Sequence, residues 1–154
     1  HPERMTNQEL RDSIGKIEPT ATFEEGKQYL NVIVAPEKWY NLAKQLKESK
    51  ELSLDYLFNL TGVDYGDNLG VVYHLESTTY HHAVVVKVLT NRQNPEIPTI
   101  CDIWRTAEFH EREVFDFFGV IFTNHPDLRR MFLDEDWKGY PLRKDYDPSQ
   151  NQRY

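Results

Sequence analysis

The sequence has little cysteine: Cys101 is the single thiol among 154 residues, so an internal disulfide cannot form. One thiolate is also too few for a cysteine zinc cage or for the ligand set of an iron–sulfur cluster. Asp102 follows it and no basic residue stands beside it, which favours a small buried side chain over a reactive thiolate. This cysteine usage fits a protein that faces the cytosol.

Long hydrophobic runs and clusters of positive charge are also missing. No stretch of about 18 apolar residues occurs, so no segment is expected to span a membrane. The net charge is −7, and residues 1–124 hold 19 acidic but only 12 basic residues, which argues against a nucleic-acid surface. No signal peptide opens the sequence, and His1 in place of an initiator methionine indicates a trimmed N-terminus.

The common motifs of phosphate binding and acyl transfer are absent as well. The sequence contains no GxGxxG, no P-loop and no Ser-His-Asp pattern. It also has no internal repeat, low-complexity tract or linker, and its length predicts a single domain. These absences leave no visible chemistry in the chain itself.

Hydrophobic periodicity predicts a set of strands followed by a helical segment. Helices are expected over residues 7–16 and 36–48, a hairpin over 21–25 and 28–35, and a meander of three strands over 54–63, 70–76 and 83–89. His81 and His82 open the last strand and are expected to be solvated. This order is typical of an α+β two-layer domain in which helices pack on one sheet.

Two prolines and two asparagines predict a loop over residues 91–98. Thr99 then has the position of a helix cap, with an acidic residue three positions later, so a short helix is expected from Thr99. Trp104 is the expected core anchor of this region.

The stretch around which the chain is organised begins with a helix over residues 107–118. Thr106 is the expected N-cap, and Gly119 stands where a left-handed C-terminal residue would fall. An apolar arc gathers Val114, Phe115, Phe117 and Phe118, whereas Arg112, Glu113 and Asp116 lie on the other side. Glu111 falls inside the apolar arc, where an unpaired carboxylate would be costly.

A buried carboxylate requires a cation, and two arginines follow. Pro126 disfavours helical geometry at His125, so the chain is expected to turn back and deliver Arg129 and Arg130 toward the helix. Arginine suits this role because its planar guanidinium can form two hydrogen bonds with one carboxylate. We therefore expect Glu111 or Glu113 to be paired with Arg129 or Arg130.

Two chemical alternatives remain for the same stretch. Glu111, Glu113 and His125 offer the ligand types of a small metal-dependent enzyme, although their spacing differs from that of an HExxH helix. A raised pKa of Glu111 would also suit general acid–base work. Charges interleaved with arginines more often fix geometry, so the pattern favours a structural or interface role.

The last segment, residues 133–154, has too few regularly spaced apolar residues to fold alone, and we expect it to form an extended arm on a domain of residues 1–132. It nevertheless carries Trp137, Tyr140, Leu142, Arg143 and Tyr146, the residue types that anchor interfaces. Much of the arm is expected to be mobile until it docks on a partner.

The run EREVFDFFGVIFTNHPDLRRMF, followed by GYPLRKDY at 139–146, resembles the 30-kilodalton subunit family of respiratory complex I, the C subunits of proton-pumping NADH-quinone oxidoreductase. Residues 72–75 and the loop 94–98 before Trp104 are similar to it too. The resemblance implies a small mixed, mainly antiparallel sheet. It places the family signature and interface at Glu111, Arg112, Glu113, Asp116, Gly119, His125, Pro126, Asp127, Leu128, Arg129, Arg130, Pro141, Leu142, Arg143, Lys144 and Asp145.

The resemblance also implies a protein without cofactors of its own, because the iron–sulfur clusters, FMN, NADH and quinone belong to partner subunits. The expected partners are the large quinone-site subunit, which residues 141–145 would contact, and neighbouring iron–sulfur subunits. The expected place is the cytoplasmic side of the bacterial inner membrane, held peripherally through the complex. Related scaffold subunits of membrane-bound energy-converting hydrogenases are an open alternative.

Overall fold

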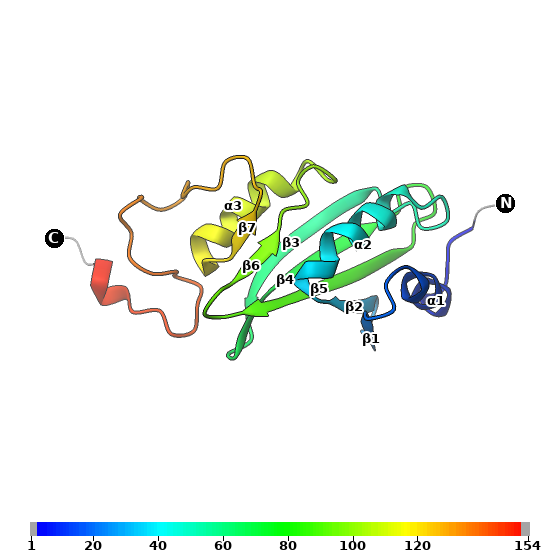
Figure 1. The fold of residues 1–154 in the computed structure, drawn as a ribbon, viewed down its shortest axis with the longest axis horizontal. Coiled ribbons are helices and arrows are strands. Elements are labelled where there is room, and N and C mark those ends of the chain that lie inside the picture. The colour runs from blue at the N-terminus through cyan, green and yellow to red at the C-terminus, as the bar shows by residue number, and fades with distance from the viewer. Residues whose placement is uncertain (1–2, 152–154) are drawn as a thin grey trace.

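The computed structural model describes residues 3–151, and its elements up to residue 91, together with the helix over 107–118, follow the predicted order (Figure 1). They are α1 (Asn7–Ile17), β1 (Thr22–Glu25), β2 (Leu30–Val34), α2 (Pro36–Glu48), β3 (Tyr56–Asp64), β4 (Asn68–Glu76), β5 (Ala83–Asn91), β6 (Glu96–Pro98), α3 (Ala107–Phe118), β7 (Ile121–Thr123) and a final 3-10 turn, η1 (Pro148–Asn151). The outermost residues of the predicted domain and arm, 1–2 and 152–154, lie outside the described residues.

The main sheet has five strands in the order β1-β2-β5-β4-β3. The β3-β4-β5 meander and the β1-β2 hairpin are antiparallel, whereas β2 and β5 are parallel, with Val32 opposite Val86. A parallel pair needs a long crossover, and the segment from α2 to β4 supplies it. The prediction of a mixed, mainly antiparallel sheet with helices packed on it is therefore confirmed.

The core lies between the sheet and α2. Alternate residues of β4, among them Val71 and Tyr73, are fully buried, as are Trp39 and Leu42 on the facing side of α2. Burying each such side chain contributes about 1.5–3 kcal/mol. Trp104 joins this core beside Trp39 and donates its indole N–H to the carbonyl of Leu54 at 3.1 Å, so the expected core anchor is confirmed.

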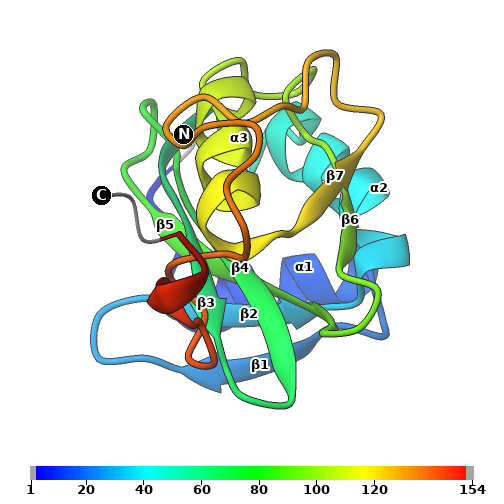
Figure 2. The ribbon, with the colours of Figure 1, turned by 90° about the vertical axis from the view of Figure 1, so that its left-hand side faces the viewer.

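Helix α3 lies beside β3, and the chain after β7 returns along it (Figure 2). The close approach depends on Gly62, because a Cβ there would lie 2.5 Å from the Phe118 ring. Gly119 ends the helix at φ 77°, as expected, and its N–H donates to the carbonyl of Phe115 at 2.8 Å. Thr106 does not cap α3 with its side chain, because its backbone is already helical.

Three local predictions were wrong. Residues 99 and 100 are irregular and a turn follows over 101–103, so no helix forms there, since the Thr99 hydroxyl and the Ile100 N–H are directed at Glu111. The loop over 91–98 ends in strand β6, which pairs with β7 in parallel. His82 is buried rather than solvated: its Nδ1 accepts the N–H of Met5 at 3.1 Å, and its Nε2 lies 2.6 Å from the carbonyl oxygen of Leu52.

Candidate functional site

The carboxylate of Glu111 is fully buried against the segment that follows β6. The Thr99 hydroxyl donates to Oε1, and the Ile100 N–H donates to Oε2 at 3.0 Å. Burial raises the pKa of Glu111 from 4.5 to about 7, although both hydrogen bonds act in the opposite direction. The predicted pairing of Glu111 with Arg129 or Arg130 was wrong, because the side chain points toward Thr99 rather than toward the chain that returns from His125.

The imidazole of His125 is the nearest basic group to Glu111, with 3.9 Å between Nε2 and Oε1. Its Nδ1 accepts the N–H of Asp127 at 3.0 Å, and its Nε2 lies 2.9 Å from the carbonyl oxygen of Glu108. Because Nδ1 accepts a hydrogen bond and Nε2 faces a carbonyl oxygen, the ring hydrogen in this arrangement lies on Nε2. His125 therefore fixes the turn before Asp127 and joins it to the start of α3.

Asp116, expected on the polar side of α3, is fully buried by the returning chain, so that placement was wrong. Its Oδ2 accepts three backbone N–H groups, from Met131 at 3.1 Å, Phe132 at 2.8 Å and Leu133 at 3.1 Å. Its Oδ1 lies 3.4 Å from Nε of Arg130. Asp116, rather than Glu111, is thus the carboxylate that holds the returning chain.

The remaining charges of the stretch pair near the surface. Asp127 lies between two arginines, 3.1 Å from Nη1 of Arg112 and 2.9 Å from Nε of Arg129. Glu113 lies 3.9 Å from His110, with both side chains more than 40% exposed. Neither Glu111 nor Glu113 is paired with an arginine within residues 3–151. Leu128 is half-buried against the core, and Pro126 is exposed.

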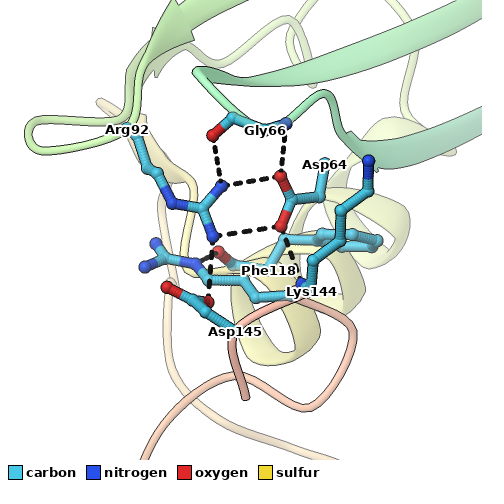
Figure 3. Close-up of polar contacts among 7 residues, drawn as sticks. Asp64, Gly66, Arg92, Phe118, Lys144 and Asp145 are labelled. Atoms are coloured by element: carbon cyan, nitrogen blue, oxygen red, sulfur yellow. Dashed lines mark hydrogen bonds and ion pairs between the residues drawn. The ribbon is translucent and has the colours of Figure 1, made fainter.

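The arm is attached to the domain by a pair of residues that the sequence did not single out. The Asp64 carboxylate accepts hydrogen bonds from Nη1 of Arg92 at 2.6 Å and from Nη2 at 3.1 Å. It also accepts the backbone N–H of Gly66 and that of Lys144, both at 2.8 Å (Figure 3). Arg92 also donates to Asp145 at 2.9 Å. The Arg92 hydrogen bonds hold the pKa of Asp64 well below its usual range.

A second attachment surrounds the ring of Tyr140, which lies between the guanidinium groups of Arg130 and Arg143, 4.9 and 4.7 Å from its centroid. Arg143 donates through Nε to the carbonyl of Phe118 at 2.6 Å. The same ring covers Gly119, where a Cβ would lie 2.6 Å from it. The predicted motif residues 143–145 thus all contact the chain's own domain.

Five apolar side chains beside α3, here called the α3 surface, are partly or largely open to solvent. They are Phe109, Phe117, Met131, Phe132 and Leu142, and the exposed fractions of Phe109, Phe132 and Leu142 are 44, 44 and 56%. The Phe132 ring lies 5.5 Å from Phe109 and 5.7 Å from Phe117, centroid to centroid. A groove of about 300 Å³ continues from Leu142 toward Gly62 on β3. Exposed apolar side chains that cluster in this way form a candidate docking surface.

The three side chains of the metal-site alternative do not converge. Glu111 and His125 approach each other, but Glu113 faces His110 on another side of the helix. Across residues 3–151, no group of three or more His, Cys, Asp and Glu side chains is placed to hold a metal ion. Cys101 is half-buried rather than buried, and burial raises the pKa of its thiol. None of the helices within this range is long and apolar enough to cross a membrane.

The family model for the 30 Kd subunit of respiratory-chain NADH dehydrogenase matches residues 32–152. The C/D subunit of the NADH-quinone oxidoreductase of Phocaeicola vulgatus is 51% identical over 120 residues, which are 77% of this chain and 23% of that protein. The C subunit of the same oxidoreductase from Chloroherpeton thalassium is 47% identical over 110 residues, 70% of this chain and 46% of that protein. The chain thus spans less than half the length of these relatives.

Two solved structures are similar. One belongs to the membrane-bound sulfane sulfur reductase, an archaeal respiratory membrane complex, with a TM-score of 0.77, 26% identity and coverage of 94% of this chain and 90% of that chain. The other is the trypsin-resistant fragment of Nqo5, with a TM-score of 0.65, 27% identity and coverage of 77% and 98%. The sequence match over residues 32–152 is decisive: the chain belongs to the family of the 30 Kd subunit of respiratory-chain NADH dehydrogenase.

Proposed function

We propose that the chain is a non-catalytic scaffold subunit in the peripheral arm of an NADH-quinone oxidoreductase, where it supports electron transfer from NADH to quinone coupled to proton translocation. Family membership supports the assignment to this complex, and the α3 surface is the observation that supports the scaffold role. Exposed aromatic residues that gather over one helix, with paired charges around them, are typical of a surface that binds another protein.

The proposed main partner is the large quinone-site subunit, with the iron–sulfur subunits of the complex as neighbours. The C/D relatives contain this chain's counterpart as 23% of a longer protein, which supports a close association of the two subunits. The α3 surface and the outer side of the arm are the proposed contacts. This association would hold the chain peripherally on the cytoplasmic side of the membrane.

The arm of residues 133–154 is proposed as a partner-binding extension of the domain of residues 1–132. Its charged motif residues contact the domain, while Leu142 is 56% exposed and adjoins the groove beside Phe118. The contacts of Lys144 and Asp145 would therefore orient the arm, and its apolar residues would meet the partner.

Binding to the large subunit tests this function. Phe132→Ala should raise the dissociation constant about 30-fold, because a central aromatic anchor contributes roughly 2 kcal/mol to binding. Tyr56→Ala is the matched control, since Tyr56 is 47% exposed but its ring lies beside Phe58, 6.1 Å between centroids, and is not part of the α3 surface. Equal affinities of both variants and the unchanged chain would contradict the proposal.

The cofactors are proposed to reside in partner subunits: iron–sulfur clusters, FMN, quinone and NADH. The purified chain should be colourless and redox-silent. Elemental analysis that found about one iron or zinc per chain after mild chelation would instead support the metal-dependent enzyme. A scaffold role in an energy-converting hydrogenase or related complex is the second candidate, favoured by the 94% coverage in the match to the archaeal respiratory complex.

A further inference from the structure

Glu111 differs from the other buried carboxylates of the described chain in its partners. Asp64 is held by Arg92 and Asp116 by Arg130. Glu111 is fully buried, yet no arginine or lysine among residues 3–151 forms an ion pair with it. Its carboxyl group meets a hydroxyl and an amide instead. An ionised carboxylate without a cation is strongly disfavoured in such a place.

The groups that face Glu111 from each neighbouring element do not supply the missing charge. They are Thr99, Cys101 and Asp102 from the segment after β6, Tyr73 from β4, His125 after β7 and Glu108 from α3 itself. Asp102 and Glu108 add negative charge, which opposes ionisation of Glu111. His125 is the single potential cation of this set, and protonating its Nδ1 would break the hydrogen bond from Asp127.

The hydrogen-bond partner of Glu111 is 6% exposed and lies at the edge of a cleft. Thr99 lines an open cleft of about 680 Å³, together with Tyr40, Asp102, Asn124 and Pro126. The Thr99 hydroxyl donates to Glu111 and accepts the N–H of Cys101 at 3.2 Å, and Thr99 and Cys101, both from the segment after β6, line the cleft. A hydroxyl can both donate and accept, so it can hand a proton between the cleft and a buried carboxyl group.

We propose that Glu111 and Thr99 form a proton-binding site, which exchanges one proton with the cleft. In the protonated form, the carboxylic O–H of Glu111 donates to Oγ1 of Thr99, and the second oxygen still accepts the Ile100 N–H. On release, the proton leaves through the cleft, and Thr99 turns its own O–H toward the carboxylate. The bound proton stabilises the contact that Glu111 of α3 makes with Thr99 and Ile100.

The sign of the pH dependence follows from the raised pKa of Glu111, which is about 7 in the folded chain against 4.5 ordinarily. The stabilisation is complete below pH 4.5 and is lost as pH rises through 7, because the unfolded chain releases this proton first. The folding equilibrium constant should fall by up to tenfold per pH unit in this window, between about two and three orders of magnitude in all.

The test is an NMR titration of the full chain labelled with ¹³C at the glutamate carboxyl carbons, from about pH 4 to pH 9. Glu111→Gln assigns the resonance, and its amide can keep both hydrogen bonds. We expect a midpoint near 7 for Glu111, together with a flattened pH dependence of unfolding in Glu111→Gln. The matched control is Glu113→Gln, an exposed position on the same helix, which should leave the dependence unchanged.

A Glu111 midpoint near 4.5 would overturn the proposal. The same conclusion would follow if Glu113→Gln flattened the stability profile as much as Glu111→Gln. Should Glu111→Gln fail to fold, Thr99→Ser would assign the resonance by a chemical-shift change, and the midpoint of the unchanged chain would still decide the question. Because the readout needs no partner, it is independent of the proposed scaffold role.

Discussion

Removing the carboxylate of Asp116 should release the returning chain from α3. Asp116→Ala deletes the acceptor of three backbone N–H groups, those of Met131, Phe132 and Leu133, at 2.8–3.1 Å. It also leaves Arg130, whose side chain is 10% exposed, without its carboxylate. Removing one partner of a buried charge pair typically costs about 3–5 kcal/mol, and we expect a loss in this range.

The assay is equilibrium unfolding in denaturant, in which the midpoint and the slope of the unfolding free energy against denaturant concentration are both measured. Hydrogen exchange at the amides of residues 131–133 is measured alongside it. Asp116→Asn keeps an acceptor oxygen but removes the charge, so it should lose roughly half as much. Asp127→Ala is the control, since that carboxylate is 44% exposed and its two arginine pairs should contribute about 0–1 kcal/mol. If Asp116→Ala unfolded at the same denaturant concentration as the unchanged chain, with unprotected amides in both, the assignment of Asp116 as the anchor would be refuted.

Two further substitutions probe the attachment of the arm. Gly119→Ala should destabilise the fold by about 1–3 kcal/mol, because it places a Cβ on a residue at φ 77° and 2.6 Å from the Tyr140 ring. Thermal unfolding of the double variant with Tyr140→Ala should recover part of this loss. If no stability were recovered, the ring contact would be contradicted. Asp64→Asn should reduce the loss of stability at acid pH. The depressed pKa of Asp64 gives stabilisation that is present above pH 3.8 and lost as pH falls further. An unchanged midpoint of acid unfolding would show that Arg92 does not hold an ionised Asp64.

Elements with strong periodicity were predictable from the sequence. The apolar run over residues 70–76 identified β4, and the spacing of Trp39 and Leu42 identified α2. Gly119 correctly marked the end of α3, because only a left-handed residue suits that position. These features depend on neighbours within a few residues, which a single sequence displays directly.

The partners of buried charges were not predictable in the same way. Helical spacing correctly placed Glu111 on the buried side of α3, but Thr99, the group that meets it, precedes α3 and was expected in a helix of its own. Asp64 and Arg92 lie 28 residues apart and come together only because β3, β4 and β5 pair in register. Such contacts depend on how the chain folds back, and neither composition nor periodicity encodes that directly.

The most direct measurement of the scaffold role is a pull-down with the large quinone-site subunit, comparing the full chain with a chain that ends after Phe132. The shorter chain keeps the Met131 and Phe132 amides that Asp116 binds, and it loses Leu142 and the Tyr140 attachment. Circular dichroism of both chains should confirm that the domain of residues 1–132 still folds. We expect clear retention of the large subunit by the full chain and a much weaker retention by the shorter one. Equal retention by both chains would contradict the proposed role of the arm and would show that it takes no part in docking.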